Sequence, residues 1–251
     1  LAVLDAELTL GLPAAVTAAT GIDAMVHAIE AYTSKIKKNP LSDLLAREAL
    51  RLLAANLDKV VQDGSDREAR QAMLLGSCLA GQAFANAPCA AVHALAYPLG
   101  GHFHIPHGLS NALVLPHVLG FNANDAAPLY AELAPLVVGT ALRSGSVMDQ
   151  AEQFIIALAD FSERSGLPTR LRDAGVPQNM LAQLARDAML QQRLLAERLE
   201  VLQQHVPAAM NLLSAEDHER QVSEVRQRAE SERLERVREI ELEKIAAEEE
   251  L

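Results

Sequence analysis

The stretch His93-Ala-Leu-Ala-Tyr-Pro-Leu-Gly-Gly-His-Phe-His-Ile-Pro-His107-Gly108 is the part of this sequence around which the rest is organised. Its glycines and prolines predict that it cannot form one continuous helix. The chain has eight histidines, and four of them fall in this short segment: His93, His102, His104 and His107. A broken helix so rich in imidazole has no simple packing explanation.

A second segment lies upstream and reads Gly21-Ile-Asp-Ala-Met-Val-His-Ala-Ile-Glu30. It favours a helix, in which Asp23 and His27 are four residues apart and therefore lie on one face. Together with two imidazoles from the later segment, they could form a site of three histidines and one carboxylate for a divalent metal ion.

Taken singly, each of these residues has an ordinary structural explanation. A lone histidine on an apolar helix is more often a hydrogen-bonded core residue than a ligand, and an Asp–His pair four residues apart occurs by chance on many helices. We give His117, His205 and His218 a structural interpretation. Glu30 follows His27 by about one turn, and it is predicted either to orient a metal ligand or to form a surface salt bridge.

The composition predicts an all-α fold. Of the 251 residues, 50% are hydrophobic but only 3% are aromatic, and there is no Trp. The core must therefore be built from Leu, Ala and Val, which favours packed helices over sheets. We find no alternation of Val, Ile and Thr long enough to predict a strand.

Charge and cysteine content narrow the functional classes. The formal net charge of −11 argues against a nucleic-acid partner, because a phosphate-binding surface needs clustered Lys and Arg. Two cysteines are too few for a disulfide framework and indicate a reducing cytoplasm. No apolar run reaches the roughly 18 residues of a membrane span, so no membrane is expected. The sequence starts without Met and reads as a piece of a longer chain.

Local signals set the expected helix limits in the first half. The helix that carries Asp23 should end near Ser34, and Ser42 is the expected N-cap of the next one. Ser65 or Asp66 should cap a helix over 67–86, whose many small residues suggest close neighbours.

Further signals set the limits in the second half. We expect Pro88 in the first turn of a helix that breaks at Gly100-Gly101, followed by a helix from Gly108 that Pro116 ends or kinks. From Pro128 to Leu190 the pattern is that of amphipathic helices joined by loops, with no sign of chemistry.

The character of the sequence changes near residue 190. We expect a helical metal-binding domain over 1–190 and a charged helical tail of uncertain role over 191–251, since the heptad-like spacing there is not sustained. This tail could be a solvent-facing helix or an arm for interaction with a partner.

Three runs of sequence resemble the iron-containing (group III) alcohol dehydrogenase family: Leu12-Pro-Ala-Ala-Val-Thr-Ala-Ala-Thr-Gly-Ile-Asp-Ala-Met-Val-His-Ala-Ile-Glu-Ala-Tyr32, Ala91-Val-His-Ala-Leu-Ala-Tyr-Pro-Leu-Gly-Gly101 and Ile105-Pro-His-Gly-Leu-Ser-Asn-Ala-Leu-Val-Leu-Pro-His-Val118. They occur in the family's order and at suitable separation. The resemblance extends over 1–190 and implies the family's C-terminal metal-binding helical domain.

The resemblance implies a ligand set and a reaction. Asp23, His27, His93 and His107 correspond to the metal ligands, for Fe²⁺ with Zn²⁺ as a substitute. The family oxidises an alcohol, or reduces an aldehyde or ketone, with NAD(P), so the expected partner is a small alcohol or aldehyde. A homo-oligomer is compatible with it.

Two departures from the family pattern bear on activity. Tyr97 stands where many members have a histidine thought to lie beside the nicotinamide or to relay a proton, so we expect the catalytic role to fall to Tyr97. The sequence also lacks a strand, glycine-rich turn and helix in succession, so the N-terminal dinucleotide-binding α/β domain is expected to be absent. We therefore expect this chain alone to bind metal but not to use NAD(P) productively.

Two other functional classes stay open. A helical metal-dependent hydrolase could use the same Asp and His residues to activate water, with Glu30 or His104 as the acid or base. Alternatively, the chain could be a non-catalytic metal-binding module that uses its charged tail for interaction.

Overall fold

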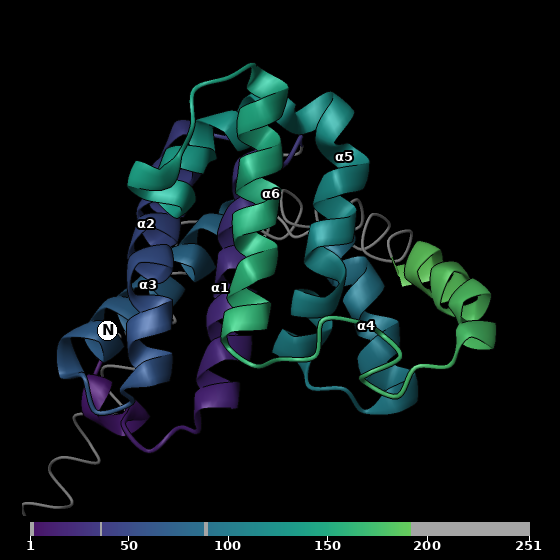
Figure 1. Ribbon diagram of the computed structural model, residues 1–251, viewed down its shortest axis with the longest axis horizontal. Helices are drawn as coiled ribbons and strands as arrows, with labels where there is room; N and C mark the ends of the chain where they lie inside the picture. The colour runs from purple at the N-terminus through teal and green to yellow at the C-terminus, as the bar shows by residue number, and fades with distance from the viewer. Residues whose placement is uncertain (1–2, 36, 88–89, 192–251) are drawn as a thin grey trace, which may run out of the picture. The chain divides into compact units, whose positions relative to one another are not determined.

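The computed structural model describes residues 3–35, 37–87 and 90–191. These residues form α-helices and short 3-10 helices and contain no strand, so the predicted all-α fold is confirmed for the described part of the chain (Figure 1). The α-helices are α1 (Ala14–Thr33), α2 (Pro40–Gln62), α3 (Arg67–Asn86), α4 (Ala91–Phe103), α5 (His107–Val138) and α6 (Val147–Arg164). The 3-10 helices are η1 (Ala6–Thr9), η2 (Gly139–Ala141) and η3 (Gln178–Met180), and residues 181–191 are again helical.

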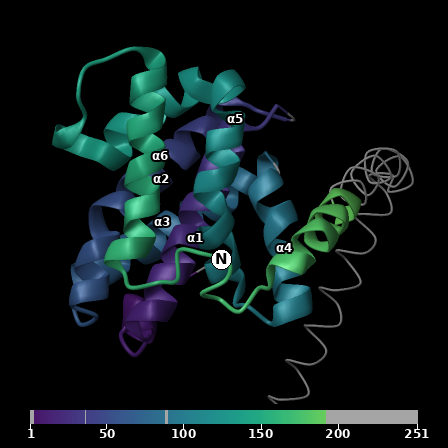
Figure 2. The same ribbon diagram turned by 45° about the vertical axis from the view of Figure 1, so that its right-hand side comes forward.

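Helix α1 is the central element of the bundle. It packs against α2, α3, α5 and α6, and Figures 1 and 2 show it with helices on several sides. Its side chains are small or apolar nearly all round, and Ile22, Met25 and Ile29 are among the largest fully buried side chains. A helix that is apolar on all sides belongs in the core. Asp23 and His27 are thus polar groups carried by the most enclosed helix of the fold.

Helix starts mostly follow local capping rules. The N-cap of α3 is Asp66, one of the two predicted candidates, and Ser146 forms a capping box with Asp149 at the start of α6. The prediction for α2 is wrong by three residues, because its N-cap is Asn39 and not Ser42. The Asn39 side chain accepts a hydrogen bond from the Ser42 amide. Pro40 at the first helical position already has the backbone angle that the helix needs, so the helix starts earlier.

The predicted break at Gly100-Gly101 is also wrong. Helix α4 runs through Pro98 and both glycines to Phe103 and ends at His104, whose φ of 54° lies in the left-handed region. Each glycine costs a helix about 1 kcal/mol relative to alanine, but burial of Leu99 offsets this locally. The segment 93–108 is nevertheless broken as predicted, since three non-helical residues separate α4 from α5.

Helix α5 passes through Pro116, so the predicted end at that residue is wrong, while the kink predicted as the alternative stays a prediction. Pro116, Pro128 and Pro135 all lie inside the 32 residues of this helix. A proline removes one backbone hydrogen bond of its helix. The apolar side chains around Pro116, including Leu113, Leu115 and Leu119, are buried against the rest of the bundle, and this tertiary packing keeps the helix going.

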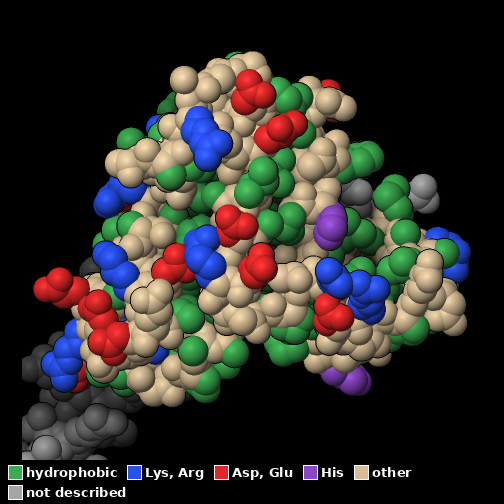
Figure 3. All heavy atoms as spheres, viewed as in Figure 1, with side chains coloured by type: hydrophobic (Ala, Val, Ile, Leu, Met, Phe, Trp, Pro, Cys, Tyr) green, Lys and Arg blue, Asp and Glu red, His purple; other side chains and the backbone are tan. Residues whose placement is uncertain are grey.

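Positive and negative side chains are mixed on the surface of the described residues. On the face shown in Figure 3, Lys and Arg side chains are scattered among Asp and Glu, and they do not gather into one basic patch among the described residues there.

None of the described helices has both the length and the hydropathy that a bilayer crossing demands. The predicted charged tail over 191–251 lies, from residue 192 on, outside the described residues, as do Pro88, His205 and His218.

Candidate metal centre

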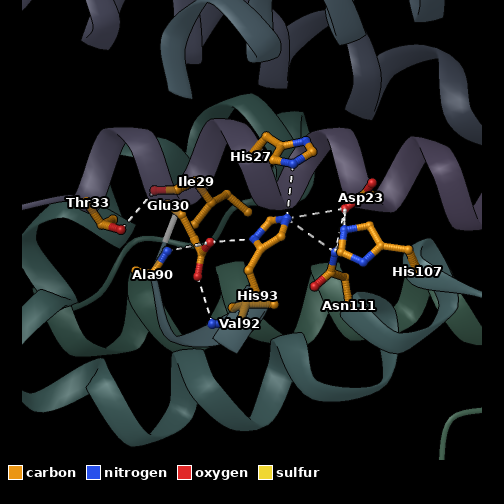
Figure 4. A network of polar contacts seen from close by, with 10 residues as sticks. All are labelled: Asp23, His27, Ile29, Glu30, Thr33, Ala90, Val92, His93, His107 and Asn111. Carbon is orange, nitrogen blue, oxygen red and sulfur yellow. Dashed lines mark hydrogen bonds and ion pairs between the residues drawn. The ribbon is translucent and has the colours of Figure 1, made fainter. Parts of the chain in front are cut away.

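Three different helices bring metal-binding groups together. Asp23 comes from α1, His93 from α4 and His107 from the first turn of α5, and one ligand atom from each lies within 4.8 Å of the other two. The Asp23 carboxylate Oδ1 is 3.6 Å from His93 Nε2 and 3.7 Å from His107 Nε2. Figure 4 shows the two imidazole rings and the carboxylate converging on one point.

His27 lies next to this group rather than within it. Its Nε2 is 3.0 Å from Nε2 of His93, and its ring stacks between the rings of Phe84 and His93, each with centroids 4.6 Å away. Asp23 and His27 do share one face of α1, as their spacing predicted. His27 therefore presents a third imidazole nitrogen, and a fourth potential ligand atom, beside Nε2 of His93 (Figure 4).

Glu30 fixes the orientation of His93. Of the two roles that the sequence left open for Glu30, the structure therefore supports contact with a potential metal ligand and not a surface salt bridge. Its carboxylate is buried, and Oε2 is 2.7 Å from Nδ1 of His93. The same carboxylate accepts hydrogen bonds from the backbone amides of Ala90 and Val92, so it also holds the start of α4. Because a neutral imidazole carries one proton, donation from Nδ1 to Glu30 leaves the lone pair on Nε2, facing the metal-binding group.

Asn111 is a member of the site that the sequence analysis missed. It follows His107 by four residues on α5, and its amide Nδ2 lies 2.5 Å from Asp23 Oδ1, 3.1 Å from His107 Nε2 and 3.4 Å from His93 Nε2. The spacing of four residues was the available signal, since such residues share a helical face. Its other amide atom, Oδ1, is buried and has no hydrogen-bond partner.

The local electrostatics favour, for both Asp23 and His27, the protonation state that could bind a metal ion. Burial alone would raise the pKa of Asp23, but the neighbouring imidazoles of His93, His27 and His107 together lower that pKa below its ordinary 3.8. Burial lowers the pKa of His27 below 6.5, against the raising effect of the Asp23 carboxylate. An ionised carboxylate beside neutral imidazoles is the set of donors that a divalent cation needs.

The site is closed on one side and open on the other. The His93 side chain is only 2% exposed, whereas that of His107 is 45% exposed. Tyr97, one helical turn beyond His93 on α4, is 40% exposed, and its ring stacks on that of His107 with centroids 5.8 Å apart. The structure thus places Tyr97 at the open edge, where a substrate could approach.

The other histidines of the segment do not join this group. His102 is paired with Asp187, with His102 Nε2 2.8 Å from the carboxylate, and this contact ties α4 to the helical residues 181–191. His104 is the exposed end of α4, and His117 is exposed on α5. Both His102 and His104 are exposed.

A close contact between two helices brings the ligands within reach of one another. A Cβ atom built on Gly108 would lie 2.5 Å from the carbonyl oxygen of Ala19 and 2.7 Å from its carbonyl carbon. Only glycine lets the start of α5 approach the α1 backbone so closely. Because His107 precedes Gly108 and Asp23 is four residues after Ala19, this contact sets their separation.

The donor set suits iron or zinc. Ligand atoms around an ion with bonds of about 2.0–2.2 Å lie roughly 3–3.5 Å apart. The separations His27–His93, Asp23–His93 and Asp23–His107, of 3.0, 3.6 and 3.7 Å, are close to that size, and the ligand atoms of Asp23, His93 and His107 all lie within 4.8 Å of one another. One carboxylate oxygen with imidazole nitrogens is a mixed set that Fe²⁺ and Zn²⁺ both accept. The open side leaves room for a further oxygen ligand.

Comparison with known proteins identifies the same region. The profile described as "Fe-containing alcohol dehydrogenase family, C-terminal" matches residues 17–215. Long-chain-alcohol dehydrogenase 1 of Geobacillus thermodenitrificans (strain NG80-2) is 45% identical over 195 residues, which are 78% of this chain and 49% of that protein.

Two solved structures extend the match to the fold. The crystal structure of a 1,3-propanediol oxidoreductase is 44% identical, with a TM-score of 0.71 over 74% of this chain and 48% of that one. Sulfoacetaldehyde reductase from Bifidobacterium kashiwanohense, solved in complex with NAD⁺, is 30% identical, with a TM-score of 0.64 over 73% of this chain and 46% of that one. The chain thus spans about half the length of the relatives it matches.

Proposed function

This chain belongs to the iron-containing alcohol dehydrogenase family, and from that premise we propose that it is the metal-binding part of an oxidoreductase that interconverts a small alcohol and its aldehyde or ketone with NAD(P). One observation carries the proposal: Asp23, His93 and His107, which lie on three different helices, bring their ligand atoms within 4.8 Å of one another. Family membership favours this reaction over the hydrolase alternative.

We infer that Asp23, His27, His93 and His107 hold the metal ion, Fe²⁺ or Zn²⁺. A bound divalent cation supplies Lewis acidity at the substrate oxygen. The chain's own residues set the geometry for this. Glu30 fixes the His93 ring, the stacked ring of Phe84 restrains His27, and the half-exposed His107 leaves one side accessible to substrate.

Tyr97 is the proposed catalytic residue. Its ring stacks on that of His107 at the open edge of the group, and this position supports a role in donating a hydrogen bond to a substrate oxygen. A nicotinamide, when bound, would supply the hydride chemistry, and sulfoacetaldehyde reductase, one of the longer relatives, is solved in complex with NAD⁺.

Metal analysis tests the proposal directly. The chain purified without oxygen is expected to contain close to one equivalent of iron or zinc. The variants His93→Ala and His107→Ala should lose it, because each removes one of the converging nitrogens. His117→Ala is the matched control, since that histidine is exposed on the same helix as His107 and lies outside the group. Equal metal content in all four proteins would refute the site.

A further inference from the structure

The amide of Asn111 occupies an unusual position among the metal-binding groups. Its Nδ2 is within 3.4 Å of all three converging acceptors, namely Asp23 Oδ1, His107 Nε2 and His93 Nε2 (Figure 4). These acceptors come from α1, α5 and α4, so this one donor joins three helices.

Without a cation the three acceptors would oppose one another. A carboxylate oxygen and two imidazole nitrogens present lone pairs and negative charge to a common point, and such groups repel in a partly buried site. The Nδ2 amino group is the positively polarised group among them that does not itself belong to the ligand set. It therefore offsets part of the repulsion that a metal ion would otherwise remove.

The other polar atom of the Asn111 amide, Oδ1, indicates why the amide adopts this orientation. Asn111 is fully buried, and its Oδ1 has no hydrogen-bond partner. A buried acceptor without a partner is costly, and a native structure accepts that cost only for a reason. The reason here is that the opposite orientation would turn Oδ1 toward two other acceptors, the Asp23 carboxylate and the lone pair on His93 Nε2.

We propose that the Asn111 amide is a stand-in for the cation: in the metal-free chain it holds the three ligand atoms together, and metal binding displaces its contacts with His93 and His107. This rests on the proposed metal site. The contact with Asp23 can persist, because a carboxylate can accept a hydrogen bond and coordinate an ion at once. Asn111 is therefore a positioning residue whose amide stabilises the metal-free state more than the metal-bound state.

The test compares the two states in the full chain. Asn111→Leu has a similar branched shape but no donor, and it should lower the unfolding midpoint of the metal-free chain more than that of the Zn²⁺-loaded chain. By thermodynamic linkage, its Zn²⁺ dissociation constant from chelator competition should fall about three- to tenfold. A purely structural residue would lower both midpoints equally and leave the dissociation constant unchanged.

The matched control is Ser110→Ala. Ser110 is also fully buried on α5, but its hydroxyl bonds the carbonyl oxygen of Ile105 and not the ligand set. Its removal should lower both midpoints together. If Asn111→Leu fails to fold, Asn111→Asp replaces the donor by a second carboxylate facing Asp23, and it should tighten Zn²⁺ binding by more than about tenfold.

The outcomes separate this inference from the site itself. If the unmodified chain binds Zn²⁺ no better than His93→Ala, the metal site is wrong and the inference falls with it. If the unmodified chain binds Zn²⁺ but the Asn111 variants bind it equally well or more weakly, the metal site stands and the stand-in role is overturned.

Discussion

The two ring nitrogens of His93 face different partners. Nδ1 faces the buried Glu30 carboxylate, and Nε2 faces His27, Asn111 and Asp23. The histidine pattern in the sequence identified His93, but only the fold reveals which nitrogen is available. The carboxylate of Glu30 determines this across 63 residues of chain.

Glu30→Gln should weaken Zn²⁺ binding by about 10- to 100-fold, because an amide cannot accept from both backbone amides and from His93 Nδ1 as the carboxylate does. Unfolding free energy should also fall by about 1–3 kcal/mol. Chelator competition and urea titration measure the two effects. Glu48→Gln is the control, since Glu48 is exposed on α2 and pairs only with Arg51; a similar loss in both variants would contradict the role of Glu30.

The stability of the metal-free chain should depend on pH through His27. Its pKa is lower in the folded chain than the ordinary 6.5, so the unfolded chain binds more protons in the interval between the two values. The contribution of His27 is therefore complete above about pH 6.5 and is lost as the pH falls below that. The corresponding interval for Asp23 lies below pH 3.8, because its pKa is lowered as well.

Urea midpoints at pH 7.5, 6.0 and 5.0 measure this dependence. His27→Gln should flatten the curve between pH 7.5 and 5.0, whereas His117→Gln, a change at an exposed position, should leave its shape intact. Zn²⁺ affinity should fall over the same range, because protons compete for the imidazoles. A curve of unchanged shape in His27→Gln would assign the dependence to other groups.

At the scale of the elements, the close approach of α5 to α1 is the contact that sets the separation of His107 and Asp23. Gly108 stands where a Cβ would overlap the Ala19 carbonyl, and it directly follows His107. The sequence shows a glycine at this position but gives no hint of what it touches.

Gly108→Ala should lower the unfolding free energy by about 2–4 kcal/mol and weaken metal binding, because the helices must separate to admit the methyl group. Gly120→Ala is the matched control on the same helix, as nothing lies within 4 Å of the Cβ that it would add. That variant should be neutral or stabilised by up to about 1 kcal/mol. Thermal unfolding and Zn²⁺ titration of both variants provide the comparison, and equal stability would exclude the close contact.

Helix limits show how local and tertiary effects divide. Asp66 as a cap and the end of α1 near Ser34 were predictable, because capping depends on a few neighbouring residues. The passage of α4 through Gly100-Gly101 and of α5 through Pro116 was not predictable, since it depends on burial of the flanking side chains in the bundle.

At the scale of the whole molecule, metal binding and turnover should separate. The 251-residue chain spans about half of its relatives, and its described residues contain no strand on which a dinucleotide fold could be built. We expect this chain, loaded with Fe²⁺ or Zn²⁺, to retain metal but to show no oxidation of short primary alcohols with NAD⁺ above the level of His93→Ala. Absorbance of NADH at saturating alcohol measures this, and turnover at the rate of a full-length relative would contradict it.

The sequence alone determined the helical class, the family resemblance and the candidate ligands Asp23, His27, His93 and His107, because composition, periodicity and short motifs are local properties. Only the tertiary structure decided that Asp23, His93 and His107 converge, that His27 stacks beside them, and that Glu30 and Asn111 belong to the same network. The physical reason is that these contacts join different helices, between residues up to 88 positions apart, and their distances depend on close approaches such as that of Gly108 to Ala19.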